Sequence, residues 1–179
     1  VNLTELHILR IDNDALTDIS VVYIKDLVKL TKLSIALGKS CTSISIDAIM
    51  THKEQLTELN VYYGGVLISR DCFRILFEGC VNVTSEAYFG NFTTDEIFPF
   101  DKHHFKRLTR LCALEKFLSK VDFMTRTEYA HLRELTIFFP KDEMFEAVKK
   151  CPNLVKLCFD YHSFSDSSII TMFKQWQTA

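Results

Sequence analysis

The stretch CPNLVKLCFDYHSFSDSSIITMF, residues Cys151–Phe173, decides the fold. Its apolar residues Leu154, Leu157 and Phe159 form an L-x-x-L-x-L pattern, in which the last positions alternate as in a strand with one buried face. A polar turn and then an apolar segment with helical spacing follow. The stretch therefore predicts one strand, one turn and one helix.

The same pattern recurs along the chain, and this recurrence defines the architecture. Good copies start at Leu3, Leu30, Leu56, Leu132 and Leu154, and those that follow one another directly start 22 to 27 residues apart. A strand and a helix repeated at this period stack as a curved solenoid, because each copy buries its leucines only against its neighbours. We predict a single α/β solenoid domain over residues 1–179, a horseshoe with parallel strands on the concave face and helices on the convex face.

Residues 82–126 fit the repeat poorly, and we assign them to irregular or degenerate copies. Val83 looks like another start, but Glu86 stands where the second leucine belongs. Residues 93–100 are expected to form a loop or a distorted turn. Residues 102–114 are predicted to be helical, with Phe105, Leu108 and Cys112 on one face. We place the start of a further degenerate copy at Leu114.

Cap residues mark the expected helix ends. Thr17 or Asp18 is predicted to cap the first helix and Ser69 a later one, because their side-chain oxygens accept backbone N–H groups. That later helix is predicted to end at Gly79, because glycine is common at helix C-termini. A helix from about residue 142 is predicted to bury Phe145 and Val148, and a last helix runs from Asp166 to about Gln175.

Composition narrows the class of function. The net charge is −2, which argues against nucleic acid as the main ligand, because phosphate binding needs a basic surface. No apolar run approaches the ~20 residues that cross a bilayer, and no secretory signal is visible. The sequence begins at Val1 within an apolar pattern and has no initiator methionine, so we expect a fragment of a longer chain.

The six cysteines form no C-x-x-C pair. Their even number permits three disulfides, but we favour reduced, buried thiols and a cytoplasmic or nuclear location. The glycosylation triplets at Asn2, Asn82 and Asn91 matter only in a secreted chain.

The repeat resembles the leucine-rich repeat, in particular its cysteine-containing class. In that class a cysteine closes the previous helix and precedes x-N-L-x-x-L-x-L, as Cys151-Pro152-Asn153-Leu154 does here. In the same class a T-D or S-D pair introduces the next helix, and Ser165-Asp166 matches this feature here. Cys80 with Asn82 matches the first feature in part, and Thr17-Asp18 matches the second in part.

The resemblance implies a module that binds a protein on its concave face. It points to the substrate-recognition part of an F-box-type ubiquitin ligase, with a Skp adaptor and a cullin recruited through an F-box upstream. The alternative is an interaction or regulatory domain without ligase function, as in ribonuclease-inhibitor-like or immune-receptor repeats.

No catalytic constellation is visible in the sequence. Phosphate-binding, dinucleotide-binding and zinc-protease motifs are absent from the sequence, and only five glycines occur. Cys112 with His103 or His104 could be imagined as nucleophile and base, but a buried cysteine beside a solvated histidine pair is the better interpretation. The histidine pair also lacks further metal ligands at sensible spacing. We expect no enzyme activity, no cofactor and no metal.

Strand alternation predicts which side chains line the concave face, because residues between the core leucines point away from the core. The aromatic residues just beyond them would serve as anchors for a partner, whereas Tyr63 and Phe139 are expected to turn into the core. The predicted protein-binding face comprises Glu5, His7, Lys32, Glu58, Asn60, Tyr62, Glu134, Thr136, Phe138, Lys156, Asp160 and Tyr161.

Overall fold

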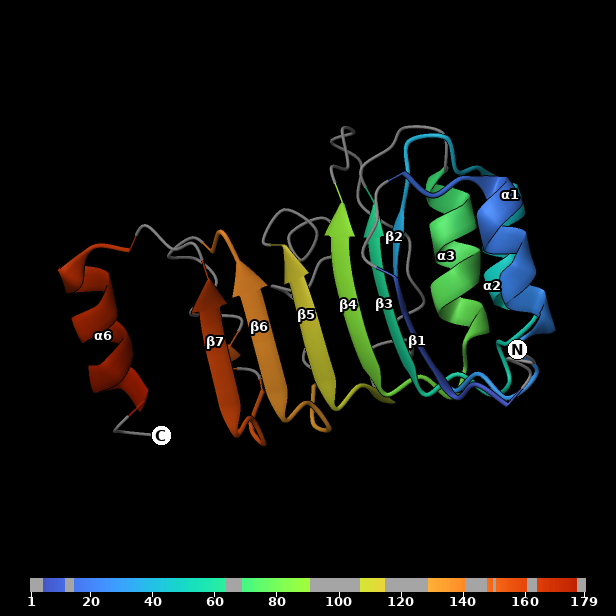
Figure 1. Cartoon of the computed structure of the whole chain (residues 1–179). Helices are drawn as coiled ribbons and strands as arrows, with labels where there is room; N and C mark the ends of the chain where they lie inside the picture. The colour runs from blue at the N-terminus through green and yellow to red at the C-terminus, as the bar shows by residue number, and fades with distance from the viewer. Residues whose placement is uncertain are drawn as a thin grey trace.

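The computed structural model describes residues 5–11, 15–63, 69–90, 107–114, 129–140, 148–149, 151–160 and 164–176. Within these residues the chain forms one parallel sheet of seven strands, which lie in the sheet in the same order as in the sequence (Figure 1). The fold is therefore mixed α/β with a parallel sheet, as the alternation of strand and helix patterns predicts.

The strands are short and regularly spaced. They are β1 Ile8–Ile11, β2 Lys32–Leu37, β3 Glu58–Tyr63, β4 Ser85–Gly90, β5 Arg110–Leu114, β6 Glu134–Phe138 and β7 Lys156–Asp160. The described helices are α1 Asp18–Val21, the 3-10 helix η1 Val22–Asp26, α2 Ser43–Met50, α3 Arg70–Gly79 and α6 Asp166–Trp176. Helices α1, α2 and α3 lie side by side along the first strands, and α6 lies beyond β7 at the opposite end (Figure 1).

One backbone contact recurs at every junction between strands. The N–H of the residue before each strand donates to the carbonyl of the equivalent residue before the preceding strand. The donor–acceptor pairs are Thr31 to His7, Thr57 to Thr31, Thr84 to Thr57, Thr109 to Thr84, Arg133 to Thr109 and Val155 to Arg133, at 2.8 to 3.0 Å. Each strand from β2 to β7 is therefore aligned with the preceding strand in the same register.

The core follows from this shared register. Leu33 lies beside Leu59, and Leu111 beside Leu135, and all four are buried. Buried side chains from the helices pack into the same cluster, and these are Val21, Ile24, Ile46, Ile49 and Leu76. Full burial of each such side chain contributes about 1.5–3 kcal/mol, so the leucine rows are the main source of stability.

Two asparagines repeat one contact in the turns before β4 and β7. Asn82 Nδ2 donates to Glu54 O, and Asn153 Nδ2 donates to Ala130 O, each at 2.6 Å. Each accepting carbonyl lies two residues before the first leucine of the preceding copy. Cys80 and Cys151, two residues before these asparagines, are buried.

Asp18 joins two successive copies through the start of α2. Its carboxylate accepts from Thr42 N at 2.9 Å, from Thr42 Oγ1 at 2.7 Å and from Ser45 N at 3.2 Å. Burial alone would raise the pKa of Asp18, but the hydrogen bonds from Ser45 and Thr42 hold it below its ordinary value. Thr17 occupies the N-cap position of α1 without a side-chain cap bond, so Asp18 caps the next helix rather than its own.

The predicted start of the first copy is wrong by three residues. Leu9 pairs with Leu33 and Ile11 with Ile35, so the copy starts at Leu6 and not at Leu3. The sequence from Leu3 to Ile11 satisfies the pattern in both positions. The hydrogen bonds from Thr31 N and Lys32 N to His7 O decide between them.

The prediction of a helix over 102–114 is also wrong for residues 107–114, which are the part of this range that the structure describes. Arg110–Leu114 forms β5 between β4 and β6, so Leu108, Leu111 and Ala113 are the pattern of this copy and Leu114 ends its strand. All three are buried. The spacing of the apolar residues there is compatible with either a helix or a strand. Hydrogen-bonded pairing with β4 and β6 stabilises the strand. Residue 86, which breaks the leucine pattern, still aligns with Leu59 and Leu111.

The prediction that a helix ends at Gly79 is confirmed, because α3 ends there, although this glycine does not take a positive φ. A Cβ at Gly79 would meet the flexible end of the Met50 side chain, which shows that α3 packs closely on α2 at this point. One further expectation fails at a single residue. Phe139 is 59% exposed with φ at 52°, because β6 ends at Phe138 and the chain turns sharply. Phe139 is therefore not a core residue.

Other expectations are confirmed or lie outside the described residues. Ser69 caps α3 by accepting from Cys72 N, and the last helix occupies Asp166–Trp176. All six cysteines are free thiols, but only Cys41, Cys80 and Cys151 are buried as expected, whereas Cys72 and Cys112 are half-buried and Cys158 is exposed. The expectations for 93–100, Phe105 and the helix from 142 with Phe145 fall outside the described residues; Val148 is buried.

The leucine rows provide a direct test of the register. Leu135→Ala should lower the free energy of unfolding by about 2–5 kcal/mol, because Leu135 is fully buried. Lys156→Ala should change it by less than about 0.5 kcal/mol, because this side chain is mostly exposed. Urea unfolding measures both. Equal losses would show that the strand faces are assigned wrongly.

Asp18 provides a pH-dependent test. Asp18→Asn should cost about 0.5–2 kcal/mol at pH 7, because it removes a charged cap from α2. Since the folded-state pKa lies below the unfolded value of 3.8, this contribution is complete above pH 3.8 and disappears as pH falls through the folded pKa. Urea unfolding from pH 7 to pH 3 should therefore show the two proteins converging in acid, whereas Asp47→Asn, an exposed change on the same helix, should be neutral.

Candidate protein-binding face

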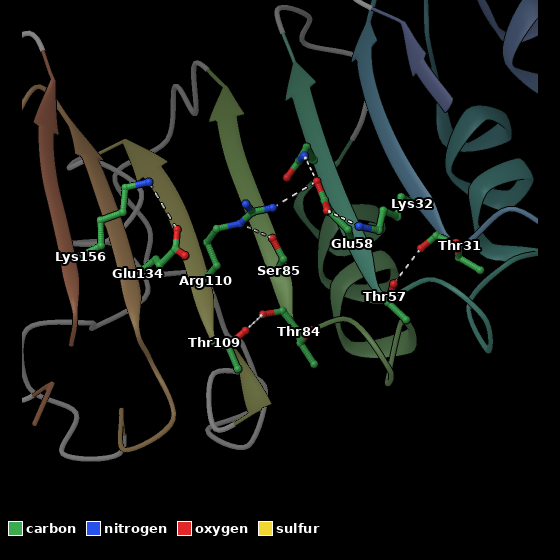
Figure 2. Close-up of polar contacts among 11 residues, drawn as sticks. Thr31, Lys32, Thr57, Glu58, Thr84, Ser85, Thr109, Arg110, Glu134 and Lys156 are labelled. Carbon is green, nitrogen blue, oxygen red and sulfur yellow. Dashed lines mark hydrogen bonds and ion pairs between the residues drawn. The ribbon is translucent and has the colours of Figure 1, made fainter. Parts of the chain in front are cut away.

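The side of the sheet opposite the leucine core carries three parallel rows of residues, which we call the polar sheet face. The first residue of each strand from β2 to β7 makes up the charged row. In pairing order these residues are Lys32, Glu58, Ser85, Arg110, Glu134 and Lys156. Figure 2 shows them across the successive strands.

Glu58 is the centre of the charged row. It is only 8% exposed, and three side chains contact its carboxylate. Arg110 Nη2 lies 3.2 Å from Glu58 Oε1, Lys32 Nζ lies 3.6 Å from Oε2, and Asn60 Nδ2 donates to Oε1 at 3.2 Å (Figure 2). A buried carboxylate is stable only when it is paired and hydrogen-bonded, and these partners meet that need.

Arg110 reaches across two strands. Its Nε donates to Ser85 Oγ on β4 at 2.8 Å, while its Nη2 reaches Glu58 on β3 (Figure 2). These contacts hold the guanidinium flat along the sheet, although the side chain remains 46% exposed. A second, more exposed pair follows, in which Lys156 Nζ lies 3.6 Å from Glu134 Oε2. Such an exposed pair contributes little to stability.

A row of threonines borders the charged row at the strand starts. Thr57 Oγ1 donates to Thr31 O at 3.2 Å, and Thr109 Oγ1 donates to Thr84 O at 3.1 Å (Figure 2). Thr31 Oγ1 donates to His7 O at 3.1 Å in the same way. These hydroxyls support the backbone contacts that set the register.

The two remaining rows are uncharged over most of their length. The second row is Arg10, Ser34, Asn60, Ala87, Cys112, Thr136 and Cys158, in pairing order. The third row includes the pairs Ala36–Tyr62 and Phe138–Asp160. Tyr62 and Phe138 are half-buried. The polar sheet face is thus mostly charged at the strand starts and carries two aromatic side chains, Tyr62 and Phe138, toward the strand ends.

Most of the predicted face residues lie on the polar sheet face. They are Lys32, Glu58, Asn60, Tyr62, Glu134, Thr136, Phe138, Lys156 and Asp160. Glu5 and His7 do not, because β1 starts at Ile8; Glu5 Oε2 instead pairs with Lys29 Nζ at 2.7 Å. Tyr161 lies outside the described residues.

Arg110, Ser85 and Arg10 lie on the polar sheet face but are not in the face predicted from the sequence. Periodicity predicts a helix at Arg110, and a first copy that starts at Leu3 leaves Arg10 beyond its strand pattern. The signal for Arg110 is the pattern formed by Leu108, Leu111 and Ala113, in which alanine replaces the last leucine.

The chemistry of Cys112 does not fit a nucleophile. Burial raises the pKa of its thiol to about 11, and Cys158, two strands away in the same row, adds to this rise. The thiol is therefore protonated at neutral pH, whereas a nucleophilic cysteine needs a lowered pKa. His103 and His104 lie outside the described residues. Among the residues that the structure describes, no group of three or more potential metal ligands comes together.

His52 is the one buried histidine in the described part of the chain, and its contacts are structural. Its Nε2 lies 2.8 Å from Ile24 O, and its Nδ1 lies 2.7 Å from Gln55 Nε2. The ring thereby links η1 of one copy to the turn after α2 in the next.

Within the described ranges, no helix is both long enough and apolar enough to span a bilayer. Comparisons with protein-family models, with curated proteins and with solved structures found no match. The interpretation of the polar sheet face therefore depends on its own geometry.

The ion pairs of Glu58 allow a double-mutant test. Arg110→Met should cost about 1–2 kcal/mol, because Glu58 loses one of its two cations. Lys32→Met should cost more in the Arg110→Met protein than in the wild type, since the carboxylate then has no cation left. Urea unfolding of the four proteins gives the coupling energy. Lys156→Met, which breaks only the exposed pair, should change stability by less than about 0.5 kcal/mol.

Proposed function

We propose that this protein is a leucine-rich repeat solenoid of the cysteine-containing class, whose polar sheet face binds another protein. The recurring backbone contact before every strand supports a repeat architecture. The buried Cys80 and Cys151, with Asn82 and Asn153 donating to equivalent carbonyls, support the class. In this proposal the strands line the concave side of a horseshoe and the helices its convex side.

The observation that carries the binding proposal is the composition of the polar sheet face. Tyr62 and Phe138 are partly exposed on a sheet face whose other side chains are mostly polar or small, and Arg110 is held in position by Glu58 and Ser85. Aromatic and arginine side chains dominate the binding energy of protein interfaces. A rigid sheet also holds them without the entropy cost of ordering a loop.

The ligase role rests on the resemblance in the repeat pattern. In this proposal the polar sheet face recognises a protein substrate, while an F-box elsewhere in the parent protein binds a Skp adaptor and a cullin. The repeat domain itself is non-catalytic. The protein works in the cytoplasm or the nucleus, where its thiols stay reduced.

Face variants test the binding proposal. Tyr62→Ala and Phe138→Ala should each weaken partner binding at least about tenfold, as loss of an interface anchor does. Lys53→Glu, an exposed change in the turn after α2, should leave binding within about twofold. Affinity purification of the natural full-length protein from its own cells, followed by quantitative mass spectrometry, gives both ratios. Thermal unfolding of each variant checks that the fold is retained.

The same purification separates the two parts of the proposal. Recovery of a Skp adaptor and a cullin with all variants, and of a further protein only with the wild type and Lys53→Glu, supports both. Absence of the adaptor and the cullin removes the ligase role and leaves a regulatory interaction domain. Partners that bind all variants equally would contradict the assignment of the face.

A further inference from the structure

The polar sheet face consists of two parts with opposite net charge. Among the described residues of the part formed by β1–β5, three cations and one anion leave a net positive charge, and these residues are Arg10, Lys32, Arg110 and Glu58. The part formed by β6 and β7 has a net negative charge from Glu134, Lys156 and Asp160. The charge of a partner therefore decides which part of the face it fits.

The anion of the β1–β5 part is buried, whereas its cations are exposed. The side chains of Lys32 and Arg110 are each 46% exposed, although both contact the carboxylate of Glu58, which is buried. Arg10 on β1 is exposed as well. A single carboxylate balances only one of the two positive charges beside it, so a partner that approaches this part of the face meets positive side chains.

Arg10 and Lys32 are close neighbours on the face. Ile8 pairs with Lys32 and Arg10 pairs with Ser34, so Arg10 lies one strand and two residues away from Lys32. With strands ~4.8 Å apart and a rise of ~3.3 Å per residue, the two Cα atoms are roughly 8 Å apart. Two like charges at this separation repel each other, and a negative group bound between them would relieve the repulsion.

We propose that the β1–β5 part of the polar sheet face binds an extended segment of a partner protein that carries two or more aspartate or glutamate side chains. One carboxylate pairs with Arg110, whose guanidinium is held by Glu58 and Ser85, and another lies between Arg10 and Lys32. Arginine binds carboxylates through two parallel hydrogen bonds. This inference rests on the function proposed for the polar sheet face and names the chemistry of its partner.

The spacing of the cations favours separate carboxylates over one phosphate group. The guanidinium of Arg110 reaches Glu58 on β3, whereas Arg10 lies on β1, two strands away. Two strand spacings correspond to roughly 10 Å, which is too far for one phosphate group to bridge. An extended chain covers this distance in about three residues, so we expect the acidic residues of the partner to be two to four positions apart. A nucleic-acid strand is disfavoured by the net charge of −2 on the whole chain.

A peptide selection provides the probe. The 179-residue chain serves as bait for a phage-displayed library of random peptides about 12 residues long, which is enough to cross this part of the face. The selected peptides should be enriched in aspartate and glutamate relative to the unselected library, with the acidic residues at the expected spacing. Replacing these residues by asparagine and glutamine in a selected peptide should abolish binding.

Fluorescence anisotropy with a labelled selected peptide then tests the cations. Arg10→Gln and Arg110→Gln should each weaken binding at least about tenfold, because each removes a cation that pairs with a carboxylate. Lys53→Gln, which removes one positive charge in the turn after α2, should leave binding within about twofold. Arg110→Gln also takes a partner from Glu58, so Arg10→Gln decides the question if Arg110→Gln fails to fold. Binding should weaken as the salt concentration rises, because exposed charges are screened.

The outcomes separate this inference from the function on which it rests. Selected peptides without acidic enrichment, whose binding is lost in Tyr62→Ala but retained in Arg10→Gln and Arg110→Gln, would overturn the inference and leave the face as a binding site. Failure to recover any peptide that is sensitive to these three variants would count against both. A neutral peptide with one phosphoserine, or a thymidine oligonucleotide, that binds more tightly than the acidic peptide would overturn the assignment to carboxylates.

Discussion

The carbonyl group just before each strand sets the position of the strand that follows. It accepts the N–H of the equivalent residue in the next copy, from His7 and Thr31 at one end to Arg133 at the other. A one-residue slip at any junction would turn the leucines of that strand to the wrong face, because side chains alternate along a strand. The backbone contact and the leucine rows therefore depend on each other, and threonine hydroxyls reinforce the same carbonyls.

The polar sheet face is a consequence of that register. Alignment of the strand starts brings Glu58 between Lys32 and Arg110, although these residues lie far apart in the sequence. The low exposure of Glu58 makes its pairing necessary rather than incidental, since an unpaired carboxylate at such a position is costly. Arg110 on β5 is held by Ser85 on β4 and by Glu58 on β3, while its side chain remains 46% exposed.

Connections on the helical side also run from one copy to the next. Asp18 begins α1 but caps α2, and His52 bonds back to Ile24 in the preceding helical segment. The close approach at Gly79 brings α3 against Met50 in the same way. These three contacts join the helical segments that follow β1, β2 and β3, so each of these segments depends on its neighbour for part of its packing and hydrogen bonding.

The sequence by itself determined the unit and its faces. The spacing of Leu132, Leu135 and Ile137 is enough to predict a half-buried strand, because the side-chain period of a strand is two. It did not determine whether the first copy starts at Leu3 or at Leu6, nor whether residues 110–114 form a helix or a strand. In each case both alternatives satisfy the local periodicity, and only pairing with a neighbouring strand distinguishes them. The tertiary structure therefore decided the register, and with it the meeting of Arg110, Ser85 and Glu58 on one face.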